Sequence, residues 1–204
     1  MVQRLIDHFV YQTQITAHIS ARDVMKRLAA AALMAAVTAF AGFAVLAAKI
    51  TLAIVAIEAL AYPLNRKAER FEEMIDLPTT CLVWLINWAA MLSFLAFAVV
   101  LSTSDTVPFV LAGFIWIFGI YVHVSNTFGL LPVYNWSQMM PAFAAMFIML
   151  YNIAKNPAHN GSQTEWLITA SLVAFYIVNT FDTMNLQKTP TRPWAARAKR
   201  QTRA

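Results

Sequence analysis

The sequence has little of what a water-soluble domain or a metal centre needs. Only 12% of its 204 residues are charged and 60% are hydrophobic, with a mean hydropathy of +0.58, whereas soluble domains are about one-quarter charged. A single cysteine, Cys81, excludes a disulfide within the chain and a thiolate metal cage. The apolar residues lie in long uncharged runs. An all-α, polytopic membrane helix bundle is therefore the predicted fold.

Catalytic signatures are missing as well. The chain has no HExxH, GxSxG, GxGxxG or P-loop pattern, and each of these would carry a recognisable chemistry. Of the four histidines, only His123 lies in an apolar segment, so one chain cannot supply two facing haem ligands. We assign no catalytic residue, no metal site and no cofactor, and we expect that this chain is not an enzyme.

The basic residues flank the apolar segments. The formal net charge is +5 and the pI is near 9.6, which could indicate nucleic acid as a partner. Their placement beside apolar runs is typical of residues that mark the cytoplasmic side of a membrane. We therefore expect the lipid bilayer, and not nucleic acid, as the partner of these charges.

Residues 1–19 are predicted to form an N-terminal amphipathic helix. Apolar residues recur there at helical spacing, but the segment is too polar to span, so we expect it to lie in the cytoplasmic interface. Ser20 and Asp23 are typical of a helix start, with a hydroxyl cap followed by an acid. A transmembrane helical domain is predicted over 20–184, followed by a basic cytoplasmic tail or linker over 185–204.

The longest apolar run, residues 28–64, leaves two interpretations open. As one helix it would reach about 55 Å, against a hydrocarbon core of about 30 Å. Alternatively, it forms a tight hairpin at Gly42, with arms 21–41 and 44–64, because glycine tolerates tight turns. The hairpin gives six spans with thirteen basic residues inside and Lys155 alone outside; one long helix gives five spans with nine inside and five outside. The positive-inside bias favours six spans with both termini in the cytoplasm.

Four further apolar runs predict the remaining spans. They cover residues 79–101, 108–127, 137–153 and 165–181. Pro141 would fall in the first turn of the third of these, where a proline is tolerated. The charged segment 65–78 is predicted to be a solvated cytoplasmic connection, and 155–163 a plain turn.

A few polar residues within or beside the spans are candidates for binding a ligand or sensing protons. They are Glu58, His123, Asn126, Asn179 and Asp182. His123 and Asn126 are three residues apart and share a helix face. They could form a polar pocket on the cytoplasmic side, or simply lie near headgroups at a helix end. Glu58 is farther from a boundary, and two interpretations stay open for it: a structural pair with Lys49 or with His123, or a proton site.

The order of these features matches a known layout. An apolar hairpin closes with an acid in IVAIEALAYPLNR, a charged connection follows, a histidine comes late in the fourth span in GIYVHVSN, and a proline comes early in the fifth in QMMPAF. This layout resembles the N-terminal multi-pass membrane region of bacterial hybrid sensor histidine kinases. The resemblance implies an input or anchoring domain ahead of a cytoplasmic linker and kinase core. The chain itself has no phospho-acceptor box or ATP-binding glycine boxes, so it would be the membrane part alone.

The sequence thus predicts a sensory or anchoring module of the bacterial inner membrane. We expect it to act as a homodimer or with a partner membrane or cytoplasmic signalling protein. The alternative is a small transporter or channel subunit. Transport would need polar residues over the whole depth of the bilayer, whereas the candidates cluster on one side, which favours the sensory module.

Overall fold

The computed structural model describes residues 2–68, 75–128 and 132–159. All regular elements in these ranges are helical. They are α1 (Val2–Arg22), α2 (Val24–Thr38), η1 (Ala39–Phe43), α3 (Ala44–Ala68), α4 (Leu77–Leu101), α5 (Val107–Phe128), α6 (Pro132–Lys155) and η2 (Pro157–His159). The all-helical fold is therefore confirmed for the described part of the chain. The expected span over 165–181 and the tail over 185–204 lie outside the described residues.

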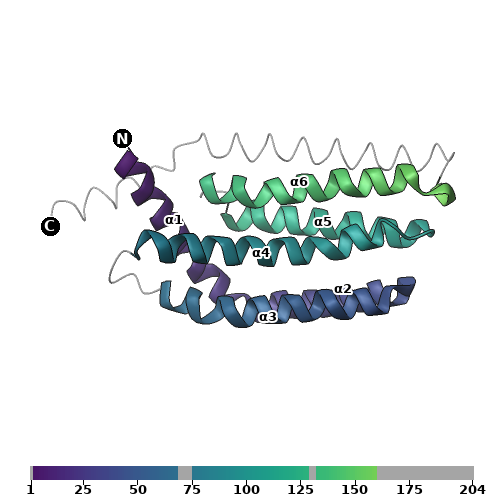
Figure 1. Ribbon diagram of the computed structural model, residues 1–204, viewed down its shortest axis with the longest axis horizontal. Coiled ribbons are helices and arrows are strands. Elements are labelled where there is room, and N and C mark those ends of the chain that lie inside the picture. Colours follow the sequence, from purple (N-terminus) through teal and green to yellow (C-terminus); the bar gives the residue numbers. More distant parts are fainter. Residues whose placement is uncertain (1, 69–74, 129–131, 160–204) are drawn as a thin grey trace.

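The chain reverses direction at Gly42. This residue has φ +92° and ψ 1°, a left-handed conformation that glycine adopts without the penalty a Cβ would bring. The two arms, α2 and α3, pack against each other (Figure 1), and Ala31 from the first arm shares an apolar cluster with Ile54 from the second. The structure therefore has the hairpin and not the single long helix.

The junction between α1 and α2 differs from the expected helix start. Ser20 is buried inside α1, so the prediction of a cap at Ser20 is wrong. Asp23 takes the position before α2, but its side chain makes no capping bond. Instead its carboxylate accepts a hydrogen bond from Lys26 Nζ at 2.7 Å. The first arm consequently begins at Val24, three residues later than predicted.

Helix α4 lies at the centre of the bundle. It packs against α3 of the hairpin and against both α5 and α6, and Figure 1 shows it between these two groups. Leu95 and Ala98 face α5 and α6 in one buried cluster, whereas Phe94 and Phe97 face the hairpin in another. Because α4 presents buried residues to both groups, it joins the hairpin to the rest of the bundle.

Helix α1 crosses one end of the bundle obliquely (Figure 1) and packs on α3, α4 and α6. It is longer than the predicted 1–19 segment. Ala17 lies in a buried cluster with Ala68 and Val83. The face turned to the bundle also buries polar side chains, among them Gln12 and Thr13. Much of its polarity is therefore enclosed by protein, which hydropathy alone could not indicate.

Two tryptophans of α4 form hydrogen bonds with α6 next to a proline in that helix. Pro141 lies in the interior of α6, not in its first turn as predicted. Since proline has no N–H, the carbonyl four residues earlier, that of Ser137, loses its helical donor. Trp88 Nε1 of α4 donates to this carbonyl at 3.0 Å, and Trp84 Nε1 donates to the Ser137 hydroxyl at 3.0 Å. Trp88 therefore replaces the donor that the proline removes, as neighbouring helices do in membranes, and Trp84 adds a second hydrogen bond to the same residue.

The opposite end of the bundle carries its own polar contacts. Asn152 Nδ2 donates to Ser102 Oγ at 2.9 Å, which ties α6 to the end of α4. His159 is buried, and its Nε2 lies 2.8 Å from the carbonyl of Ser104. The segment predicted as a plain turn thus includes a buried histidine contact, which holds the α4–α5 connection against the end of α6.

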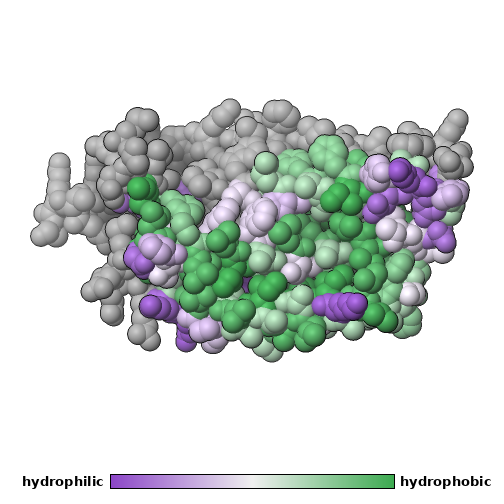
Figure 2. Space-filling model, in the orientation of Figure 1, coloured by the Kyte–Doolittle hydropathy of each residue, from purple (hydrophilic) through white to green (hydrophobic). Residues whose placement is uncertain are grey.

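The outer surface of the bundle is largely apolar. Leu33, Phe40 and Leu52 are each at least 65% exposed, and Figure 2 shows hydrophobic residues over much of the visible face. Among the described residues, three helical stretches are long and apolar enough to cross a membrane: Val24–Ala68, Leu77–Leu101 and Val107–Val124. The first contains the reversal at Gly42, and α6 adds a shorter apolar helix. This surface suits a lipid environment.

Candidate functional site

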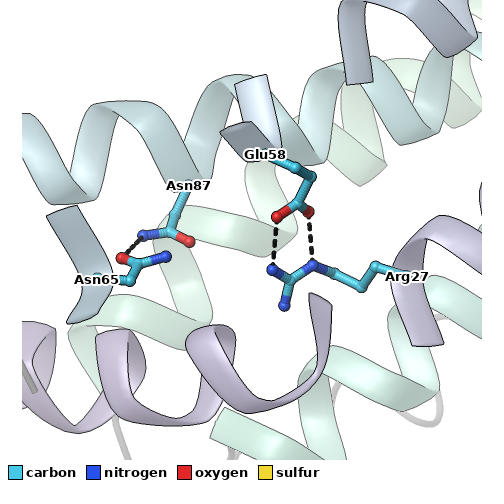
Figure 3. A network of polar contacts seen from close by, with 4 residues as sticks. All are labelled: Arg27, Glu58, Asn65 and Asn87. Carbon is cyan, nitrogen blue, oxygen red and sulfur yellow. Dashed lines mark hydrogen bonds and ion pairs between the residues drawn. The ribbon is translucent and has the colours of Figure 1, made fainter. Parts of the chain in front are cut away.

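A buried ion pair links the two arms of the hairpin. Arg27 Nε donates to Glu58 Oε1 at 2.6 Å and Arg27 Nη2 donates to Glu58 Oε2 at 2.8 Å (Figure 3). The Glu58 side chain is 3% exposed and that of Arg27 is 22% exposed. Arg27 lies fifteen residues before Gly42 and Glu58 sixteen after it, so the reversal brings them to the same level. The planar guanidinium suits such two-point binding of a carboxylate.

The partner of Glu58 therefore differs from both expectations. Neither Lys49 nor His123 binds it; Arg27 occupies both of its oxygens. From the sequence, Arg27 is one of the thirteen basic residues assigned to the cytoplasmic side, next to the first span. The pair could have been predicted from the positions of Arg27 and Glu58 relative to Gly42, because residues at equal chain distance from a tight turn lie opposite one another.

A cavity of about 330 Å³ opens beside this pair. It lies between α2, α4 and α5, close to the end of α1. Apolar side chains make most of the wall, including Met91, Phe94, Trp116 and Ile120. Trp116 Nε1 donates to the carbonyl of Phe94 at 2.8 Å, so α5 is tied to α4 at the wall. The size and the apolar wall are typical of a small-molecule site.

Charged groups gather at one end of this cavity and form what we call the rim: Asp23, Lys26, Arg27 and His123. The hydrogen bond from Lys26 lowers the pKa of the Asp23 carboxyl below its ordinary value, burial opposes that shift, and the charges of Lys26, His123 and Arg27 add to the lowering. Asp23 is therefore ionised at neutral pH. The cavity thus has an apolar interior and an ionic mouth.

A second polar pair lies near the ion pair in Figure 3. Asn87 Nδ2 of α4 donates to Asn65 Oδ1 of α3 at 3.3 Å and to the carbonyl of Val83 at 2.8 Å. The Nδ2 atom of buried Asn65 has no hydrogen-bond partner in the described structure. Because Asn87 also lines the cavity, this pair extends the polar contacts from the cavity toward α3.

The sequence candidates are only partly brought together. His123 lines the cavity, and Glu58 is connected to it through Arg27. Asn126 belongs to α5, but its side chain lies outside the described residues, as do Asn179 and Asp182 entirely. Sequence reasoning missed Asp23, Lys26 and Arg27 as members of the rim. Their approach to His123 depends on how α2 and α5 face each other across the cavity.

The rim can offer hydrogen bonds and charge, but a metal site is not apparent. Within the described ranges, no group of three or more histidine, cysteine, aspartate or glutamate side chains is placed to hold a metal ion. The arrangement is suited to binding a ligand with an apolar body and a polar end. Comparisons with protein-family models, with curated proteins and with solved structures found no match for this chain.

Proposed function

We propose that this chain is a ligand-sensing or anchoring input module of the bacterial cytoplasmic membrane. It has six spans with both termini in the cytoplasm, and it acts as a homodimer or with a signalling protein. The observation that carries the proposal is the cavity between α2, α4 and α5 with its rim of Asp23, Lys26, Arg27 and His123. A ligand there touches both the hairpin and α5, so occupancy can bias their arrangement.

The topology is supported by the basic residues and by the reversal at Gly42. We expect the hairpin bend to face the outside and the end of α3 to face the cytoplasm. Cys81→Ser removes the single cysteine, and Ala44→Cys or Lys67→Cys then places a thiol at an exposed position on either end of α3. A membrane-impermeant maleimide should label residue 44 in intact cells and residue 67 only after permeabilisation. Equal labelling of both from outside would rule out the six-span arrangement.

If the chain is a sensory module, filling the cavity should change the activity of a kinase core joined to the chain. Gly119 lines the cavity, and a Cβ added there meets no atom within 4 Å, so Gly119→Leu has room to enter it. We join the full chain to the catalytic core of a bacterial histidine kinase and measure autophosphorylation in nanodiscs. Gly119→Leu should change the rate about fivefold, a typical size for coupling between two sites.

The matched control lies one turn away on the same helix. Ile115 is 60% exposed on the outside of α5, so Ile115→Leu changes a side chain without filling the cavity and should leave phosphorylation unchanged. If Gly119→Leu and Ile115→Leu behaved alike in a well-folded chimera, the sensory role would be contradicted. Solute flux through liposomes containing the chain would instead support a transporter.

A further inference from the structure

The unused hydrogen-bonding groups at the rim are mainly donors. Arginine has five N–H donors, and the contacts of Arg27 with Glu58 use two of them. Lys26 Nζ donates to Asp23 Oδ1, and its side chain is 84% exposed. Both oxygens of Glu58 are already bound by Arg27. Donors therefore remain on both cations, whereas Glu58 is engaged by Arg27 and the ionised Asp23 of the rim accepts from Lys26 through one of its two oxygens.

The interior of the cavity selects for an apolar body. Trp116 already donates its N–H to the carbonyl of Phe94, and Asn87 Nδ2 donates to two oxygens. Met91 and Ile120 offer only apolar surface. A ligand gains little from polar groups at this depth, but it gains from removing its own apolar surface from water.

From this arrangement we infer that the cavity binds a single-chain amphiphile with an anionic head, such as a medium-chain fatty carboxylate. Its chain lies along Phe94, Trp116 and Ile120, and its head accepts hydrogen bonds at Lys26 and Arg27. A volume of about 330 Å³ is near the lower end of ligand sites, which suits one chain better than the two of a phospholipid. Lys26 and Arg27 are each paired with an acid, Asp23 or Glu58, so the head binds through their remaining N–H donors as charge-assisted hydrogen bonds and not through an excess of positive charge.

This inference deepens the proposed function and rests on it. It names the chemical class of the ligand, whereas the kinase chimera tests only whether the cavity controls output. If fatty carboxylate fails to bind while Gly119→Leu still changes phosphorylation, the ligand class is wrong and the sensory role stands.

The probe is dodecanoate carrying bromine on its chain, added to the full-length chain in nanodiscs of zwitterionic phosphatidylcholine. Bromine quenches indole fluorescence only at short range, and Trp116 lies in the cavity wall. We expect saturable quenching that unlabelled dodecanoate reverses. Trp116→Phe should remove most of the quenching while the protein remains helical by circular dichroism. Unchanged quenching in Trp116→Phe would place the chain elsewhere and overturn the inference.

Charge variants test the head group. Lys26→Gln should weaken dodecanoate binding about fivefold, the loss of one largely exposed charge-assisted hydrogen bond, and should leave dodecanol binding unchanged. Lys49→Gln is the matched control, because Lys49 is also exposed on the hairpin but does not line the cavity; it should alter neither affinity. Equal binding of dodecanoate and dodecanol to the unsubstituted chain would overturn the anionic head.

Two further experiments identify the source of the ligand. Gly119→Leu should abolish saturable quenching by dodecanoate, because the new side chain takes the space of the acyl chain. Brominated phosphatidylglycerol built into the nanodisc tests a two-chain membrane lipid as the occupant. Quenching of Trp116 by that lipid that dodecanoate does not reverse would overturn the single-chain class.

Discussion

Replacing Arg27 by methionine is expected to destabilise the protein by about 3–5 kcal/mol, the usual cost of leaving a buried charge without its partner. Glu58 is 3% exposed and Arg27 supplies both of its hydrogen bonds. Without the guanidinium, the carboxylate must stay charged in an apolar surrounding or take up a proton, and both states cost free energy. The free energy of unfolding, measured in mixed micelles by circular dichroism, gives the loss.

The two halves of the pair should not be equivalent. Glu58→Leu leaves Arg27, whose side chain is 22% exposed and borders the cavity mouth, so the cation can still reach water. We expect a smaller loss than for Arg27→Met. The double variant Arg27→Met/Glu58→Leu should recover most of the stability, because apolar residues of similar volume can replace a buried pair.

Lys49→Met is the control for simple loss of a positive charge. Lys49 is exposed on the same hairpin, and surface substitutions usually change stability by less than about 0.5 kcal/mol. A double variant as unstable as Arg27→Met alone would show that the pair does more than satisfy its own charges.

Two glycines on α5 should respond in opposite directions to the same substitution. A Cβ at Gly113 would lie 3.1 Å from the backbone oxygen of Ala98, 3.1 Å from Met149 Cε and 3.3 Å from Leu101 Cβ. A backbone oxygen within α4 cannot yield easily. Gly113→Leu should therefore separate α5 from α4 and destabilise the bundle by about 3 kcal/mol, the upper range for overpacking.

Gly119→Leu is the matched comparison. It meets no atom within 4 Å at the Cβ position, and leucine is a better helix former than glycine by about 0.5–1 kcal/mol. We expect unchanged or slightly raised stability by the same unfolding measurement. Equal destabilisation by both substitutions would contradict the close approach of α4 and α5 at Gly113. It would also remove Gly119→Leu as a clean probe of the cavity.

Several features of the fold are readable from the sequence because they depend on local composition. The predicted helices over 79–101 and 108–127 correspond to Leu77–Leu101 and Val107–Phe128, since uncharged runs bounded by polar residues limit a helix by themselves. Gly42 marked the reversal because few other residues accept its conformation.

The contacts that build the site depend instead on how helices pack. Pro141 shows that the carbonyl of Ser137 needs another donor, but nothing local selects Trp88 for that role. In the sequence Arg27 is only one of the basic residues that flank a span, and its contact with Glu58 depends on the packing of the hairpin. The rim likewise needs α2 and α5 on opposite sides of one cavity, which hydropathy does not specify. His123 was a candidate because it is a histidine within an apolar segment, whereas its neighbours in the rim depend on the packing of the helices.

The position of the ion pair along the chain bears on how the hairpin is made. Arg27 is synthesised 31 residues before Glu58, so the cation is already available when the carboxylate leaves the ribosome. On the proposed topology the two arms can enter the membrane together as a preformed hairpin whose opposite charges cancel. Neither ion then has to be transferred alone into hydrocarbon, a step that costs several kcal/mol. On that topology, pairing of Arg27 with Glu58 before insertion would remove this cost.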